Sequence, residues 1–135
     1  MSNVGFIGVG YMGYGMAKNL LKKHNVYIFA HKNRKPVNKL IKIGAKELKT
    51  YSEIKNIKID CLMMCVTNTP IAINVANKIK NYLNSNTLVI DLTTHDKNGA
   101  LKMNKIFQSK KISYNFCGVM AVSYTHLTLP TKCWV

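Results

Sequence analysis

Residues 6–20 read Phe-Ile-Gly-Val-Gly-Tyr-Met-Gly-Tyr-Gly-Met-Ala-Lys-Asn-Leu, a glycine-rich turn between a short apolar strand and an amphipathic helix. Gly8, Gly10 and Gly13 have the G-x-G-x-x-G spacing of a dinucleotide-binding turn. The first glycine allows the tight turn, the second lets the backbone approach a pyrophosphate, and the third lets the helix pack closely on the strand. In a dinucleotide-binding turn, the pyrophosphate lies on the N–H groups that begin the helix. A turn that serves packing alone is the alternative. The residues expected to form the site are Gly8, Val9, Gly10, Tyr11, Met12 and Gly13.

Apolar strands alternate with amphipathic segments along the rest of the chain. This alternation predicts an α/β fold, a Rossmann-type doubly wound parallel sheet with helices on both faces. The continuous apolar run 59–66 indicates a strand buried on both faces. Ser52 is expected to cap a brief helix. The expected strands are 3–7, 26–30, 47–50, 59–66, 88–91 and 112–116, and the expected helices are 12–23, 36–43, 69–82 and 96–109.

The composition of this 135-residue chain fits one domain, with a formal net charge of +15. Basic domains attract nucleic acid, but here the lysines are scattered and Arg34 is the only arginine among 20 basic residues. We therefore expect no nucleic-acid partner. No apolar run reaches membrane-spanning length, and no basic region with an apolar core begins the chain, so we expect a cytoplasmic protein without a membrane partner.

The second strand ends in His31-Lys32-Asn33-Arg34, without the acidic residue that binds the ribose hydroxyls in NAD-selective domains. A 2′-phosphate carries close to two negative charges, and His31, Lys32 and Arg34 are suited to bind it. The sequence therefore predicts NADP as the cofactor, rather than NAD. The alternative is that these are solvated turn residues of a lysine-rich protein.

The pattern Gly8-x-Gly10-x-Met12-Gly13-x-x-Met16-Ala17-x-Asn19-Leu20 resembles the N-terminal signature of the β-hydroxyacid dehydrogenases, with Val9 where that family usually has Leu. The family includes 3-hydroxyisobutyrate dehydrogenase and the cofactor domain of 6-phosphogluconate dehydrogenase. Two later strand ends also match: Cys65-Val66-Thr67-Asn68 stands at the family's Leu-Pro-Asp-type turn, and Asp91-Leu92-Thr93-Thr94 resembles its Asp-x-Ser-Thr motif.

The resemblance implies that Val66, Thr67 and Asn68 pass beside the cofactor's ribose and that Thr94 approaches the nicotinamide. The alternative for the threonines is that they satisfy backbone groups at a strand end. His95 is interpreted as a loop residue and Asp96 as the cap of the next helix. The sequence predicts no catalytic residue in this chain. It predicts no metal site either, because the cysteines and histidines lack ligand spacing.

The match to the family ends at Ala121, and residues 122–131 resemble one reading frame of a transposon-end adapter used in sequencing libraries. We therefore expect a truncated NAD(P)-binding domain over residues 1–121 and an artefactual tail over residues 122–135. The resemblance implies that the family's general acid–base lysine and helical second domain lie beyond this chain. The chain as given is then expected to be inactive.

For the parent protein, the resemblance implies an oxidoreductase that transfers hydride between a nicotinamide and a small 3-hydroxy acid or its semialdehyde. It implies a small-molecule substrate and a homo-oligomer at full length. Two alternatives stay open: a 6-phosphogluconate dehydrogenase-like or imine-reductase-like enzyme, and a stand-alone nucleotide-binding module without catalysis.

Overall fold

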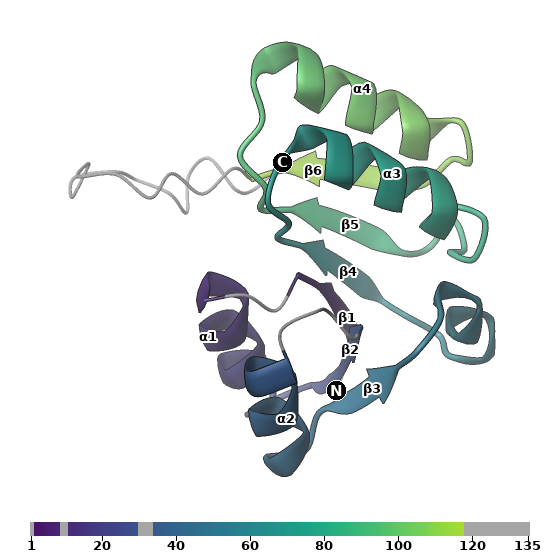
Figure 1. The fold of residues 1–135 in the computed structure, drawn as a ribbon. Coiled ribbons are helices and arrows are strands. Elements are labelled where there is room, and N and C mark those ends of the chain that lie inside the picture. Colours follow the sequence, from purple (N-terminus) through teal and green to yellow (C-terminus); the bar gives the residue numbers. More distant parts are fainter. Residues whose placement is uncertain (1, 9–10, 30–33, 118–135) are drawn as a thin grey trace.

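The computed structural model describes residues 2–8, 11–29 and 34–117, in which strands and helices alternate (Figure 1). The strands are β1 (Asn3–Ile7), β2 (Asn25–Phe29), β3 (Lys46–Leu48), β4 (Cys61–Met64), β5 (Leu88–Asp91) and β6 (Ser113–Phe116). The helices are α1 (Tyr11–Leu20), α2 (Arg34–Lys42), the 3-10 helix η1 (Tyr51–Asn56), α3 (Thr69–Ile79) and α4 (Lys97–Gln108). Within these ranges, no helix has the length and apolar character needed to cross a membrane.

The six strands form one sheet in the order β3-β2-β1-β4-β5-β6, and every neighbouring pair is parallel (Figure 1). The chain adds β2 and β3 on one side of β1 and then crosses over to add β4, β5 and β6 on the other. The predicted Rossmann-type, doubly wound fold is thereby confirmed. In such sheets ligands bind beyond the carboxyl ends of the strands where the order reverses, which here lies between β1 and β4.

Two apolar clusters cover the two faces of the sheet. Because side chains alternate along a strand, Leu62 and Met64 of β4 join the cluster with α3 and α4, and Met63 joins the one with α1 and α2. Phe107 of α4 and Phe6 of β1 are fully buried in the respective clusters. Burial of each such side chain stabilises the fold by about 1.5–3 kcal/mol.

The strand expected over 59–66 is shorter in the structure, because β4 pairs with β1 and β5 only over Cys61–Met64. Ile59 is buried from the preceding loop rather than from the strand. Nor is β4 fully buried on both faces, since Cys61 and Met63 are only half-buried. Met63 is partly exposed because it lines an open apolar groove on the side of the sheet that carries α1.

The helix caps place the loops that follow β4 and β5. Asn68 accepts a hydrogen bond from the Ile71 N–H at 3.0 Å, and Asp96 accepts one from Gly99 at 2.7 Å, as predicted for Asp96. The prediction for Ser52 is wrong, because Ser52 lies inside η1 and Thr50 precedes the helix. Both side-chain caps lie at the carboxyl edge of the sheet and fix where α3 and α4 begin.

Candidate dinucleotide-binding site

Gly8 occupies a position that only glycine fits. Its φ is +93°, in the region that side chains disfavour, and an added Cβ would lie 2.0 Å from the carbonyl oxygen of Cys65. The contact arises because β1 and β4 are adjacent, with the Cys65 N–H donating to the Ile7 carbonyl at 2.8 Å. The turn after β1 therefore packs directly against the turn after β4.

Gly13 brings the first turn of α1 against the turn that follows β1. It is buried, and an added Cβ would lie 2.2 Å from the Gly8 carbonyl oxygen. Tyr11 and Met12 form the start of α1, whose first turn carries no acidic residue. Val9 and Gly10 lie outside the described residues. The backbone of Gly8 and Gly13, which we call the glycine cradle, thus packs closely at the N-terminus of α1, a place suited to a pyrophosphate.

The turns that follow β4 and β5 meet at the same edge of the sheet. The Val66 N–H donates to Thr93 Oγ1 at 3.0 Å, and the Leu92 N–H donates to the Met64 carbonyl at 2.7 Å. Thr67, Asn68 and Thr94 are exposed. The structure therefore brings the turn that begins with Val66 against Gly8 and against Thr93, which Thr94 follows in the chain.

Arg34 begins α2 and is held by an acidic residue that the sequence analysis did not single out. Its guanidinium donates from Nη1 to Glu47 Oε2 at 2.5 Å and from Nη2 to Glu47 Oε1 at 3.1 Å. These hydrogen bonds lower the pKa of Glu47 and raise that of Arg34. His31 and Lys32 lie outside the described residues. Glu47 lies opposite Ile28 because β3 pairs with β2. The predicted strand order was therefore the feature of the sequence that could have placed Glu47 near the end of β2.

A buried polar cluster lies behind the turns after β4 and β5. Asp91 Oδ2 accepts hydrogen bonds from His95 Nε2 at 2.7 Å and from the Tyr114 hydroxyl at 2.6 Å, and Asp91 Oδ1 accepts one from the Thr93 N–H at 3.0 Å. The side chains of Asp91 and His95 are fully buried. Burial, followed by the charge and hydrogen bond of Asp91, raises the pKa of Tyr114.

His95 lies in the loop between β5 and α4, as its interpretation as a loop residue implies, but its side chain is a buried partner of Asp91. The remaining ring nitrogen, Nδ1, lies 2.7 Å from Thr69 Oγ1. The signal in the sequence was an aspartate closing an apolar strand with a histidine four residues later. Only the fold shows that both side chains turn toward α3.

The two free cysteines of the described residues are poor nucleophiles. Burial, together with the charge of Asp60, raises the pKa of Cys61 to about 11, and burial and Asp91 raise that of Cys65. Thiolates are the reactive form, so both groups are protonated near neutral pH. Among the described residues, no group of three or more His, Cys, Asp or Glu side chains is placed to hold a metal ion.

We expect Cys61 to react with iodoacetamide at pH 8 about 100-fold more slowly than an unfolded cysteine of pKa about 8.5, because so little of it is thiolate. Peptide-level mass spectrometry after timed labelling measures the rate, and the same protein in urea supplies the reference. Equal rates in the folded and unfolded protein would contradict the buried environment of Cys61.

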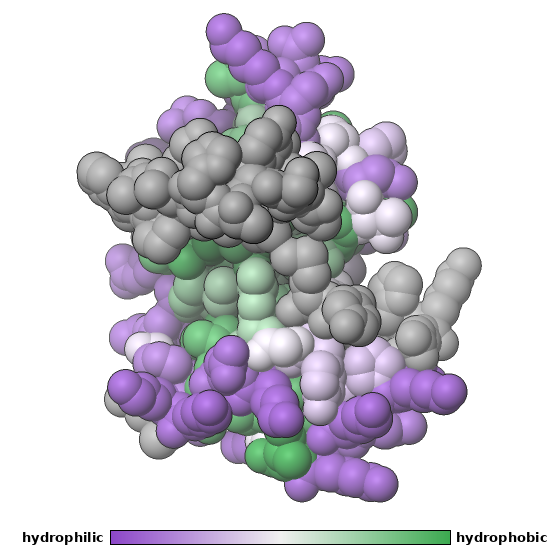
Figure 2. All heavy atoms as spheres, turned by 90° about the vertical axis from the view of Figure 1, so that its left-hand side faces the viewer, coloured by the Kyte–Doolittle hydropathy of each residue, from purple (hydrophilic) through white to green (hydrophobic). Residues whose placement is uncertain are grey.

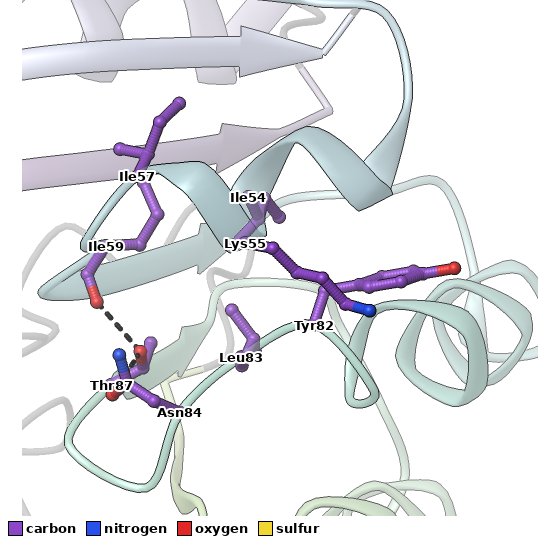
Figure 3. A pocket seen from close by; sticks show the side chains of 8 residues that line it. All are labelled: Ile54, Lys55, Ile57, Ile59, Tyr82, Leu83, Asn84 and Thr87. Atoms are coloured by element: carbon purple, nitrogen blue, oxygen red, sulfur yellow. Dashed lines mark hydrogen bonds between the residues drawn. The ribbon is translucent and has the colours of Figure 1, made fainter.

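A small cavity of about 160 Å³ lies at the opposite edge of the sheet, before the strands begin (Figure 3). Its polar groups have partners within the protein. The Thr87 hydroxyl donates to the Ile59 carbonyl at 2.8 Å, Asn84 accepts the Asn86 N–H at 2.9 Å, and the Lys55 ammonium lies 5.2 Å from the centre of the Tyr82 ring. This cavity is too small for a dinucleotide and lies away from the glycine cradle.

A larger apolar groove, of about 590 Å³, runs along the α1 side of β4 and β5. Met16 and Leu20 of α1 form one wall, and Met63, Ile90 and Leu92 form the floor. Figure 2 looks onto this side of the molecule and shows apolar residues gathered in its middle, with hydrophilic side chains around them. Among the described residues, this part of the α1 side of the sheet has no helix packed over it.

Several solved structures share this fold. Superposition on 3-hydroxyisobutyrate dehydrogenase from Mycobacterium tuberculosis with L-serine gives a TM-score of 0.80 at 18% identity, over 90% of this chain and 41% of that one. An imine reductase variant from Myxococcus stipitatus with NAD+ gives 0.80 at 19% identity, over 90% and 42%. A reductive aminase from Aspergillus terreus with NADPH and ethyl-5-oxohexanoate gives 0.71 at 18% identity, over 90% and 42%.

The chain spans about 42% of the length of such structures. At the level of sequence, the family model that matches is the NAD binding domain of 6-phosphogluconate dehydrogenase, and the match covers residues 3–121. It includes the glycine cradle and the turns after β4 and β5. The chain therefore belongs to the family of NAD binding domains of 6-phosphogluconate dehydrogenase.

Proposed function

We propose that this chain is the NADP-binding part of an oxidoreductase that transfers hydride between the nicotinamide and a small 3-hydroxy acid or its semialdehyde. The observation that carries the proposal is the cradle of Gly8 and Gly13 at the point where the strand order reverses. The fold shared with 3-hydroxyisobutyrate dehydrogenase supports the substrate class. An imine reductase variant superposes equally well, which favours an imine-reducing enzyme as the second candidate.

The proposal gives each site residue a role. The turn from Gly8 to Gly13 binds the pyrophosphate through backbone N–H groups. Val66, Thr67 and Asn68 lie beside the ribose, and Thr94 lies toward the nicotinamide, which supplies or accepts the hydride when the cofactor is bound. His31, Lys32 and Arg34 bind the 2′-phosphate.

The chemistry also needs a group that moves the hydroxyl proton, and we place it in the part of the parent protein beyond this chain. The apolar groove supports this arrangement, because Met63, Ile90 and Leu92 form a surface suited to burial against further protein. A homo-oligomer of the full-length parent is part of the same proposal. The chain as given is then inactive, although it binds the cofactor.

Sequencing the source gene beyond the codon for Ala121 tests the proposed boundary. A frame that continues into a second domain with a lysine in a helix supports the oxidoreductase, and NADPH-dependent turnover of 3-hydroxy acids by that product is the next assay. A gene that encodes residues 122–135 and then a stop would contradict the boundary and favour a stand-alone nucleotide-binding module.

The preference for NADP predicts a specific loss in an Arg34 variant. We expect Arg34→Ala to weaken NADPH binding about tenfold and to leave NADH binding unchanged, because charge-assisted hydrogen bonds to the 2′-phosphate are lost. Titration of each nucleotide, followed by its fluorescence, gives the dissociation constants.

Glu47→Gln is the matched variant for this test. The Glu47 carboxylate competes with the 2′-phosphate for the Arg34 guanidinium, so its neutralisation is expected to tighten NADPH binding a few-fold. If the wild-type chain binds NADH as tightly as NADPH, or if Arg34→Ala weakens both nucleotides equally, the NADP preference is wrong.

A further inference from the structure

We infer that His95 is a positioning residue that fixes the turn Val66–Asn68 against the loop after β5 and thereby sets the affinity for the dinucleotide. The inference rests on the proposed dinucleotide site. His95 itself would touch no cofactor, because its side chain is fully buried behind the turn. It acts through Thr69, the first residue of α3, and through Asp91, the last residue of β5.

Each ring nitrogen of His95 has one hydrogen-bond partner. The Asp91 carboxylate accepts hydrogen bonds only, so His95 Nε2 carries the proton that bonds to Oδ2. We assign the acceptor role to His95 Nδ1, which lies 2.7 Å from Thr69 Oγ1. The Phe116 ring, whose centre is 5.6 Å from that of His95, packs near the imidazole. The ring therefore has a defined orientation and a partner at each nitrogen.

The same aspartate holds the turn after β4 at both of its ends. At the first end, the Asp91 carboxylate accepts the Thr93 N–H, and Thr93 Oγ1 accepts the Val66 N–H at 3.0 Å. At the other end, Asp91 orients His95, which accepts from Thr69 directly after Asn68. The turn that packs against Gly8 is thus fixed from behind by a single buried carboxylate.

Two substitutions separate the two hydrogen bonds of His95. In His95→Asn the amide oxygen takes the place of Nδ1, so it keeps the acceptor for Thr69 and loses the bond to Asp91. In His95→Gln the amide nitrogen takes the place of Nε2, so it keeps the donor to Asp91 and loses the bond to Thr69. We expect His95→Gln, which leaves Thr69 without its partner, to weaken NADPH binding about tenfold. We expect His95→Asn, which keeps a partner for Thr69 but loses the bond to Asp91, to weaken it by less.

Thr69→Val removes the Thr69–His95 hydrogen bond without changing the buried imidazole ring. It is expected to weaken NADPH binding as much as His95→Gln does, and the double variant is expected to lose no more than either single one. Additive losses, or wild-type affinity in both single variants, would overturn the inference. Because Thr69 is only partly buried, this arm remains informative if a His95 variant fails to fold.

Tyr114→Phe is the control for a merely structural role. It removes the other donor to Asp91 Oδ2, from β6, and leaves the Thr69–His95 bond in place. We expect Tyr114→Phe to unfold at lower urea concentration but to keep its NADPH affinity within about twofold. Equal loss of affinity in Tyr114→Phe and His95→Gln would show that stability alone sets binding. A wild-type chain that binds neither NADPH nor NADH would instead overturn the proposed function, together with this inference.

Discussion

Gly8→Ala is expected to destabilise the chain by about 2–5 kcal/mol, since a left-handed backbone costs about 1–2 kcal/mol and an overpacked side chain about 1–3 kcal/mol. The residue has a φ of +93°, and the new methyl group would lie 2.0 Å from the Cys65 carbonyl oxygen. Backbone on both sides must move to relieve that contact. The same movement opens the cradle, so NADPH binding should be lost in any Gly8→Ala protein that still folds. Urea unfolding followed by circular dichroism measures the first effect.

Gly15→Ala is the matched control seven residues along the chain. Gly15 is exposed on α1, and an added Cβ would meet nothing within 4 Å. Alanine is the better helix former, so this variant should be more stable than the wild type by up to about 1 kcal/mol. If Gly8→Ala is as stable as Gly15→Ala, the turn does not have the conformation described.

Asp91→Ala is expected to cost about 3–5 kcal/mol, the usual result of removing one partner from a buried charged or hydrogen-bonded group. The substitution would leave His95 Nε2, the Tyr114 hydroxyl and the Thr93 N–H without the acceptor that each has now. It should also abolish the arrangement that orients Thr69. Thermal and urea unfolding of the purified variant provide the measurement.

Asp60→Ala separates this effect from a general loss of negative charge in a chain of net charge +15. Asp60 is exposed, and its carboxylate accepts a hydrogen bond from the Asn3 N–H at 2.8 Å. Its removal is expected to cost about 1 kcal/mol or less. Similar losses for Asp60→Ala and Asp91→Ala would mean that the buried cluster around Asp91 contributes no more than a surface contact.

Local patterns were sufficient to predict the strand order and the glycine cradle. Gly8 and Gly13 lie between an apolar strand and an amphipathic helix, the context that favours such a turn, and the alternation of apolar and amphipathic segments leaves few right-handed topologies. The cap at Asp96 was predictable for the same reason, because its hydrogen bond to Gly99 spans only three residues.

Contacts between distant segments were not predictable in this way. The partner of Arg34, at the start of α2, is Glu47 in β3. The Asp91–His95 pair is contacted by Tyr114 from β6 and by Thr69 from α3. The length of β4 also depends on its neighbours, because pairing with β1 and β5 determines where the strand ends. Each of these features requires the sheet to be assembled first.

The most direct test of the account is a ¹H–¹⁵N NMR titration of the chain with NADPH. We expect saturable shifts centred on Gly8, Gly13, Val66–Asn68 and Thr94, at the carboxyl edge of the sheet between β1 and β4. Amides from Asn84 to Thr87, beside the small cavity at the opposite edge, should not move. The absence of saturable binding, or shifts confined to residues 84–87, would contradict a dinucleotide site at the glycine cradle.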